Sequence, residues 1–128
     1  MGADQEAEVR DIVLVLEDNE ENRSFLRMLF EAEGYEVATA ANGAEALRWL
    51  NEHPAPSVIV LDLNMPIMNG WEFCAAVQGR EHLALIPMVV LSAEADASRS
   101  LPRPFTCVVK PAPPDVLVQT VAKHIRVS

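Results

Sequence analysis

Positive charge is scarce in this sequence. Its 128 residues include ten Lys and Arg against nineteen Asp and Glu, which leaves a formal net charge of -9. A surplus of this sign repels the phosphate backbone of nucleic acids and provides no basic surface to bind it. Direct recognition of DNA or RNA is therefore not expected.

Long apolar runs, targeting signals and metal-type cysteine spacings are also missing. No apolar run approaches the roughly 20 residues that cross a bilayer, and residues 1–9 lack the basic and apolar segments of a secretory signal. The two cysteines, Cys74 and Cys107, have no Cys-x-x-Cys or Cys/His spacing that would predict a zinc site or a disulfide framework. We expect a soluble cytoplasmic protein with reduced thiols and no membrane partner.

The length favours one domain, because half of the 128 residues are hydrophobic and the chain is too short for two ordinary cores. Residues 1–9 are expected to form a flexible acidic tail before a domain over residues 10–128. Five short apolar runs are candidate strands, at residues 12–16, 37–40, 58–61, 88–91 and 106–109. Helical patterns between them predict an α/β fold with a doubly wound parallel sheet and helices on both faces.

Four segments have helical patterns. Residues 20–33 place Phe25, Leu26, Leu29 and Phe30 at helical spacing and end at Gly34, a residue that often ends helices. Further helices are expected over residues 44–52, from about residue 70, and after residue 114. Between residues 93 and 104 the prolines disfavour a long helix.

Polar side chains follow the predicted strands at their carboxyl ends, where open parallel sheets bind ligands. Glu17 and Asp18 follow the first strand, Asp62 the third, Ser92 the fourth and Lys110 the fifth. Three carboxylates suit a hard cation such as Mg²⁺. Asp62 is ionised near neutral pH and needs no general base to act as a nucleophile. A hydroxyl and an ammonium could bind phosphoryl oxygens, so the set predicts phosphoryl transfer.

Each of these residues also has an ordinary interpretation. Glu17 and Asp18 could favour a helix N-terminus, Asp62 could form a turn, and Ser92 could cap a helix. Their occurrence at successive strand ends favours a common site.

Together, these motifs resemble those of response-regulator receiver domains in two-component signalling. The matching segments, in chain order, are Glu17-Asp18, Asp62-Leu63-Asn64-Met65-Pro66, Asn69-Gly70, Leu91-Ser92-Ala93 and Lys110-Pro111. The resemblance covers about residues 11–126. It implies a five-stranded sheet of order 2-1-3-4-5, about five helices with the fourth short or irregular here, and a cis peptide bond before Pro111.

The resemblance also implies roles for individual residues. Asp62 would be the phosphoacceptor, Ser92 the hydroxyl switch residue and Lys110 the lysine of the site. Glu17 and Asp18, with Asp62 and the backbone carbonyl of Asn64, would hold Mg²⁺. The donor would be a sensor histidine kinase or a phosphotransfer protein, and the downstream partner is not identified by the sequence.

One departure from the family pattern bears on output, and two positions that vary within the family bear on the lifetime of the phosphoryl group. The aromatic residue that usually lies three residues before the lysine is replaced by Cys107, with Phe105 two residues earlier. We therefore expect an atypical output surface. Asn64 and Glu94 occupy the positions that modulate dephosphorylation, and their polarity predicts a short phosphate lifetime.

The primary hypothesis is a phosphorylation-dependent switch that catalyses its own phosphorylation and dephosphorylation without being a conventional turnover enzyme. The alternative is a pseudo-receiver that acts as a phosphorylation-independent docking module. An aspartyl-phosphate hydrolase is less consistent with the sequence, because such an enzyme would need a second Asp where Asn64 stands.

Overall fold

The five apolar runs form the strands of one parallel sheet in the computed structural model, which describes residues 10–62, 70–92 and 106–127. The strands are β1 (Ile12–Leu16), β2 (Glu36–Ala40), β3 (Val58–Asp62), β4 (Met88–Ser92) and β5 (Thr106–Val109). Their order across the sheet is β2-β1-β3-β4-β5, which confirms the predicted topology.

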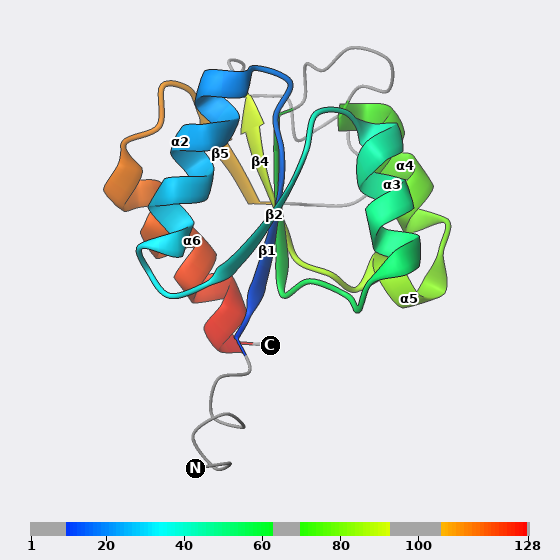
Figure 1. Cartoon of the computed structure of the whole chain (residues 1–128). Coiled ribbons are helices and arrows are strands. Elements are labelled where there is room, and N and C mark those ends of the chain that lie inside the picture. The colour runs from blue at the N-terminus through cyan, green and yellow to red at the C-terminus, as the bar shows by residue number, and fades with distance from the viewer. Residues whose placement is uncertain (1–9, 63–69, 93–105, 128) are drawn as a thin grey trace.

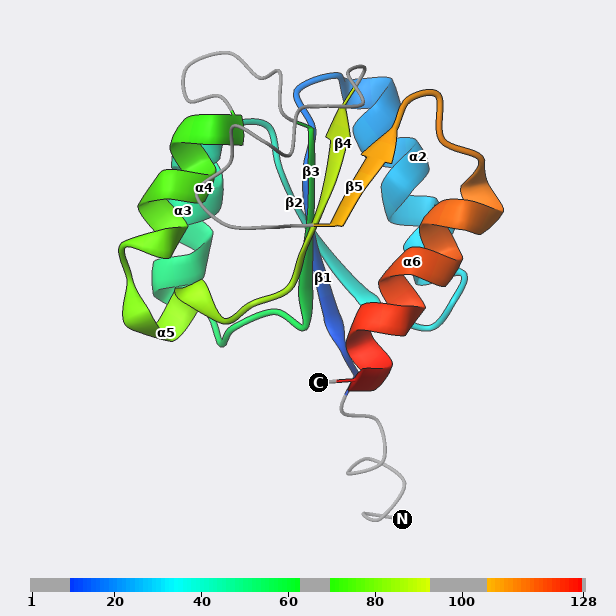
Figure 2. The same cartoon turned by 180° about the vertical axis from the view of Figure 1, so that it is seen from behind.

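Helices cover both faces of the sheet, as expected for a doubly wound fold. One face is covered by α2 (Glu20–Glu31) and α6 (Pro114–Val127), and the other by α3 (Gly43–Glu52), α4 (Gly70–Gln78) and α5 (Glu81–Ala84) (Figures 1 and 2). The short α5 was not predicted. The irregular helix expected within residues 93–104 and the tail at residues 1–9 lie outside the described residues.

The core consists of one apolar cluster on each face of the sheet. Strands β3 and β4 are buried along their whole length, so they contribute to both clusters. Phe30 of α2 and Val121 of α6 are fully buried on one face, and Phe73 of α4 on the other. Burying a side chain of this kind contributes about 1.5–3 kcal/mol. The strands that carry the polar residues at their carboxyl ends are therefore anchored in a well-packed core.

Helix α2 begins and ends with defined hydrogen bonds. The side chain of Asn19 caps the helix by accepting from the backbone N–H of Asn22 at 2.9 Å. At the other end Gly34 has a φ of 95°, and its N–H donates to the carbonyl of Glu31 at 3.0 Å. The helix ends at Glu31, slightly before the predicted end at residue 33, and Gly34 forms the left-handed turn that follows, which glycine adopts without strain.

One prediction about α2 is wrong. Phe25 was placed on the apolar face of the helix with Phe30, yet it is 48% exposed while Phe30 is fully buried. The helix presents a narrower stripe to the sheet than the sequence indicated, and Phe25 lies at its margin. Across residues 10–62, 70–92 and 106–127, no helix is both long and apolar enough to cross a bilayer.

Candidate functional site

Strand register brings the carboxyl ends of β1 and β3 together. Leu16 pairs with Leu61 across these strands, and the chain leaves them in opposite directions along the sheet. Doubly wound sheets bind ligands at the carboxyl ends of the two strands between which the chain direction reverses in this way. Glu17 follows Leu16 directly and Asp62 follows Leu61, so residues far apart in the sequence meet at one edge of the sheet.

Three carboxylates form a compact cluster at this edge. Ligand oxygens of Glu17, Asp18 and Asp62 all lie within 4.8 Å of one another. Glu17 is 3% exposed and Asp62 is 4% exposed, whereas Asp18 is open to solvent. A cluster of hard oxygen ligands with one side open to water fits Mg²⁺, which binds few carboxylates and retains waters. The fourth predicted ligand, the carbonyl of Asn64, lies outside the described residues.

The pKa of Glu17 shows how burial and neighbouring charges act within the cluster. Burial raises the pKa of its carboxyl above the ordinary value, and the neighbouring Asp62 charge and the side-chain hydrogen bond with Asp18 raise it further. The backbone N–H of Asn19 and the charge of Lys110 act in the opposite direction. The crowding of negative charge at this edge therefore makes a bound cation favourable.

Lys110 supplies the positive charge inside the cluster. Its Nζ lies 2.6 Å from Oδ2 of Asp62, and the two side chains are 35% and 6% exposed. The backbone N–H of Lys110 donates to the carbonyl of Ser92 at 2.8 Å, which places the lysine beside the end of β4. The peptide bond between Lys110 and Pro111 is cis, as predicted. Ser92 is 2% exposed at the end of the neighbouring strand.

A residue of α2 that the sequence analysis missed, Arg23, contacts the turn between β1 and α2. Nη1 of Arg23 donates to the backbone carbonyls of Glu17 at 2.8 Å and Asp18 at 3.3 Å. The backbone N–H of Asn19 donates to Oε2 of Glu17 at 3.2 Å. A cation in the first turns of a helix opposes the helix dipole. That unfavourable placement was the available signal that Arg23 has another partner.

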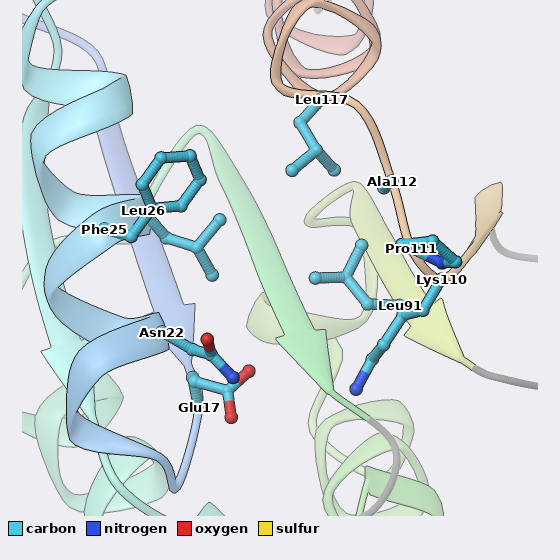
Figure 3. A pocket seen from close by; sticks show the side chains of 9 residues that line it. All are labelled: Glu17, Asn22, Phe25, Leu26, Leu91, Lys110, Pro111, Ala112 and Leu117. Atoms are coloured by element: carbon cyan, nitrogen blue, oxygen red, sulfur yellow. The ribbon is translucent and has the colours of Figure 1, made fainter.

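A pocket of about 420 Å³ lies beside the cluster. Its lining residues are Glu17, Asn22, Phe25, Leu26, Leu91, Lys110, Pro111, Ala112 and Leu117. Figure 3 shows the apolar side chains of Phe25 and Leu26 facing Leu117 across the pocket, with Glu17 and Lys110 at one end. The pocket thus joins an apolar surface to the charged site.

The predicted switch position, Cys107, lies on β5, three residues before Lys110. Cys107 pairs with Val90 on β4 and is half-buried against the cluster on the α3 and α4 face. Cys107 thus packs as a small, partly buried residue against the core. Phe105, Asn64 and Glu94 lie outside the described residues, so their predicted roles stay predictions.

With the geometry described, the comparisons with known proteins identify the family. The response regulator receiver domain matches residues 13–122, so the chain belongs to this family. Receiver domains of this family interact with histidine kinases or phosphotransfer proteins and are generally Mg²⁺-dependent.

Solved structures agree with the fold. The signal receiver domain of a signal transduction histidine kinase from Syntrophus aciditrophicus has a TM-score of 0.84 at 29% identity, covering 91% of this chain and 90% of its own. The chemotaxis response regulator CheY4 of Vibrio cholerae has a TM-score of 0.81 at 30% identity, covering 91% and 99%.

Curated relatives are longer than the matched region. The transcriptional regulatory protein KdpE of Mycobacterium tuberculosis is 40% identical over 87 residues, which is 68% of this chain and 37% of that protein. The polar-differentiation response regulator DivK of Brucella anthropi is 37% identical over 81 residues, which is 63% of this chain and 65% of that protein. The chain thus matches little more than a third of the first relative and just under two thirds of the second.

Proposed function

We propose that this receiver domain accepts a phosphoryl group on Asp62 from a sensor histidine kinase or a phosphotransfer protein in the cytoplasm, in an Mg²⁺-dependent reaction. One observation carries the proposal. The buried Asp62 carboxylate lies in a cluster with Glu17 and Asp18, and the ammonium of Lys110 contacts it at 2.6 Å. Nucleophile, cation ligands and a counter-charge are thus assembled at the switch point of the sheet.

The chemistry follows from these groups. A carboxylate oxygen of Asp62 forms a bond to phosphorus while the bond from phosphorus to the donor's imidazole nitrogen breaks. The electron pair of that bond leaves with the imidazole, which takes a proton from solvent. Asp62 needs no general base, since it attacks as the ionised carboxylate. Lys110 then balances the charge of the phosphoryl oxygens, and the Ser92 hydroxyl donates to one of them.

The metal would be held by Glu17, Asp18 and Asp62 with the backbone carbonyl of Asn64. When bound, Mg²⁺ supplies positive charge that offsets the phosphoryl oxygens. The protein's part is to present the carboxylates together. The carboxylate of Glu17 accepts a hydrogen bond from the backbone N–H of Asn19 at 3.2 Å, which orients it. Asp62 is the last residue of β3, so the strand sets the position of its backbone.

Removal of Mg²⁺ is expected to abolish phosphorylation by a small donor. Incubation with acetyl phosphate and Mg²⁺ should add one phosphoryl group to the chain, because Asp62 can attack only when the charge of the phosphoryl oxygens is offset. Incubation with acetyl phosphate and excess EDTA should add none. Intact-protein mass spectrometry measures both. An unmodified parent chain in the presence of Mg²⁺ would overturn the proposal and favour the docking-module alternative.

The apolar pocket supports docking of the donor protein. A donor must bring its phosphohistidine to Asp62, and the pocket between α2 and α6 opens next to Glu17 and Lys110 (Figure 3). Phe25 is a partly exposed aromatic side chain that lines this pocket, and aromatic side chains that become buried at the centre of an interface often dominate binding energy. A helix of the donor that places an apolar side chain in this pocket would hold its histidine near the carboxylates.

Replacing Phe25 with Ser is expected to slow phosphoryl transfer from a protein donor by about 10-fold, the effect of losing a central interface residue. Transfer from acetyl phosphate should not change, because that donor needs no docking surface. Met28→Ser is the matched control, since Met28 is 67% exposed on the same helix and does not line the pocket. Rates measured with a histidine kinase that phosphorylates the parent chain test this. Equal slowing by both substitutions, or by neither, would contradict a role for the pocket.

A further inference from the structure

Arg23 links helix α2 to the turn that carries two of the carboxylates. Its side chain is half-buried, and Nη1 donates to the carbonyls of Glu17 at 2.8 Å and Asp18 at 3.3 Å. Its backbone N–H also donates to the carbonyl of Asn19 at 2.9 Å. Backbone and side chain of this one residue thus hold three successive carbonyls of the turn.

These contacts fix the backbone at Asp18. The carbonyl of Glu17 belongs to the peptide plane before the Asp18 Cα atom, and the carbonyl of Asp18 belongs to the plane after it. Because peptide bonds are planar, holding both planes restrains the φ and ψ of Asp18 and therefore the direction of its Cα–Cβ bond, from which the carboxylate extends. The other end of the turn is held as well, since the N–H of Glu17 donates to the carbonyl of Ala40 at 3.0 Å.

Asp18 depends on this restraint more than the other two carboxylates do. Glu17 and Asp62 are buried, and the carboxylate of Glu17 accepts a hydrogen bond from the N–H of Asn19. Asp18 is exposed, so packing contributes little to its direction. Removing a group that orients a metal ligand without touching the metal itself typically lowers the affinity for the metal substantially.

We propose that Arg23 is a positioning residue for metal binding, which directs the Asp18 carboxylate into the cluster by holding the peptide planes on either side of it. The inference rests on the proposed Mg²⁺-dependent function and names a residue that this function requires. Arg23 does not touch the metal or the phosphoryl group.

The direction in which the Kd for Mg²⁺ changes when Arg23 is replaced distinguishes a positioning role from a purely electrostatic one. Removing a positive charge near a cation site should by itself strengthen Mg²⁺ binding, because like charges repel. Losing the restraint on Asp18 should weaken binding, because the carboxylate must then be ordered when the metal arrives. The two explanations predict changes in Kd of opposite direction.

Arg23→Gln is expected to raise the Kd for Mg²⁺ by about 10-fold, the lower end of the range for groups that orient metal ligands. Isothermal titration of the metal into the full chain measures it. Arg27→Gln is the matched control, because Arg27 is a cation on the same helix that pairs with Glu31 at 3.3 Å on the surface. Its Kd should stay within about two-fold of the parent value. Arg23→Lys keeps one donor group and should fall between the parent and Arg23→Gln.

A second readout addresses the turn itself. Without metal, the ¹⁵N order parameters of Asp18 and Asn19 should fall in Arg23→Gln and stay unchanged in Arg27→Gln. If the parent binds Mg²⁺ and Arg23→Gln binds it as tightly or more tightly, the positioning role is wrong and the proposed function stands. If the parent binds no Mg²⁺, both are wrong. Arg23→Lys decides the question in the same way if Arg23→Gln does not fold.

Discussion

Replacing Asp62 with Asn is expected to abolish phosphorylation by acetyl phosphate. The amide has nearly the same shape as the carboxylate, so the variant keeps the end of β3 intact, but its oxygen carries no negative charge and is a poor nucleophile. The substitution also removes one of the three carboxylates that lie within 4.8 Å of one another. Intact-protein mass spectrometry in the presence of Mg²⁺ should find the parent chain modified and the variant unmodified.

The control for this substitution is Asp115→Asn. Asp115 is an exposed acidic residue in the first turn of α6 and is not one of the three clustered carboxylates, so its replacement removes the same charge without changing the cluster. This control should be modified to the same extent as the parent. A phosphoryl adduct on Asp62→Asn at the parental yield would place the phosphoacceptor at another residue.

Replacing Lys110 with Gln is expected to slow phosphorylation by about 100-fold at saturating Mg²⁺, which is the usual effect of removing one donor that stabilises developing negative charge. The ammonium contacts Oδ2 of Asp62 at 2.6 Å, so it is already in place when the phosphoryl group arrives. Gln keeps a hydrogen-bond donor but carries no charge. The initial rate with acetyl phosphate, followed by mass, measures the effect.

Lys123→Gln is the matched control for this substitution, because Lys123 is exposed on α6 and loses the same charge. It should leave the rate unchanged. The rate should be measured at several Mg²⁺ concentrations, since a change in metal affinity disappears at saturation whereas the loss of the ammonium does not. A Lys110→Gln rate within about two-fold of the parent at saturation would remove Lys110 from the proposed chemistry.

Most of the fold could be predicted because buried parallel strands have a strong sequence signature. Continuous apolar runs indicate strands that are covered on both faces, and β3 and β4 are buried at every position. The short α5 could not be predicted in this way. Its four residues are fewer than two helical turns, and Arg80 at its start makes no side-chain cap.

The composition of the cluster was also accessible from the sequence, since parallel strands deliver their carboxyl ends to one edge of the sheet. That rule brought Glu17 and Asp62 together without knowledge of any distance. The role of Arg23 was not accessible, because its partners are backbone carbonyls, which every residue has. Phe25 was misplaced for a related reason: helical spacing gives the apolar side of α2 but not the width that the sheet covers.

The pairing of Leu16 with Leu61 has a consequence for signalling fidelity. Successive side chains of a strand point to opposite faces, so a slip of one residue between β1 and β3 would turn Asp62 away from Glu17. A mispaired chain would then lack the assembled carboxylate cluster. The native register between β1 and β3 is therefore a condition for the proposed phosphoryl acceptance, because only this pairing brings Asp62 to Glu17.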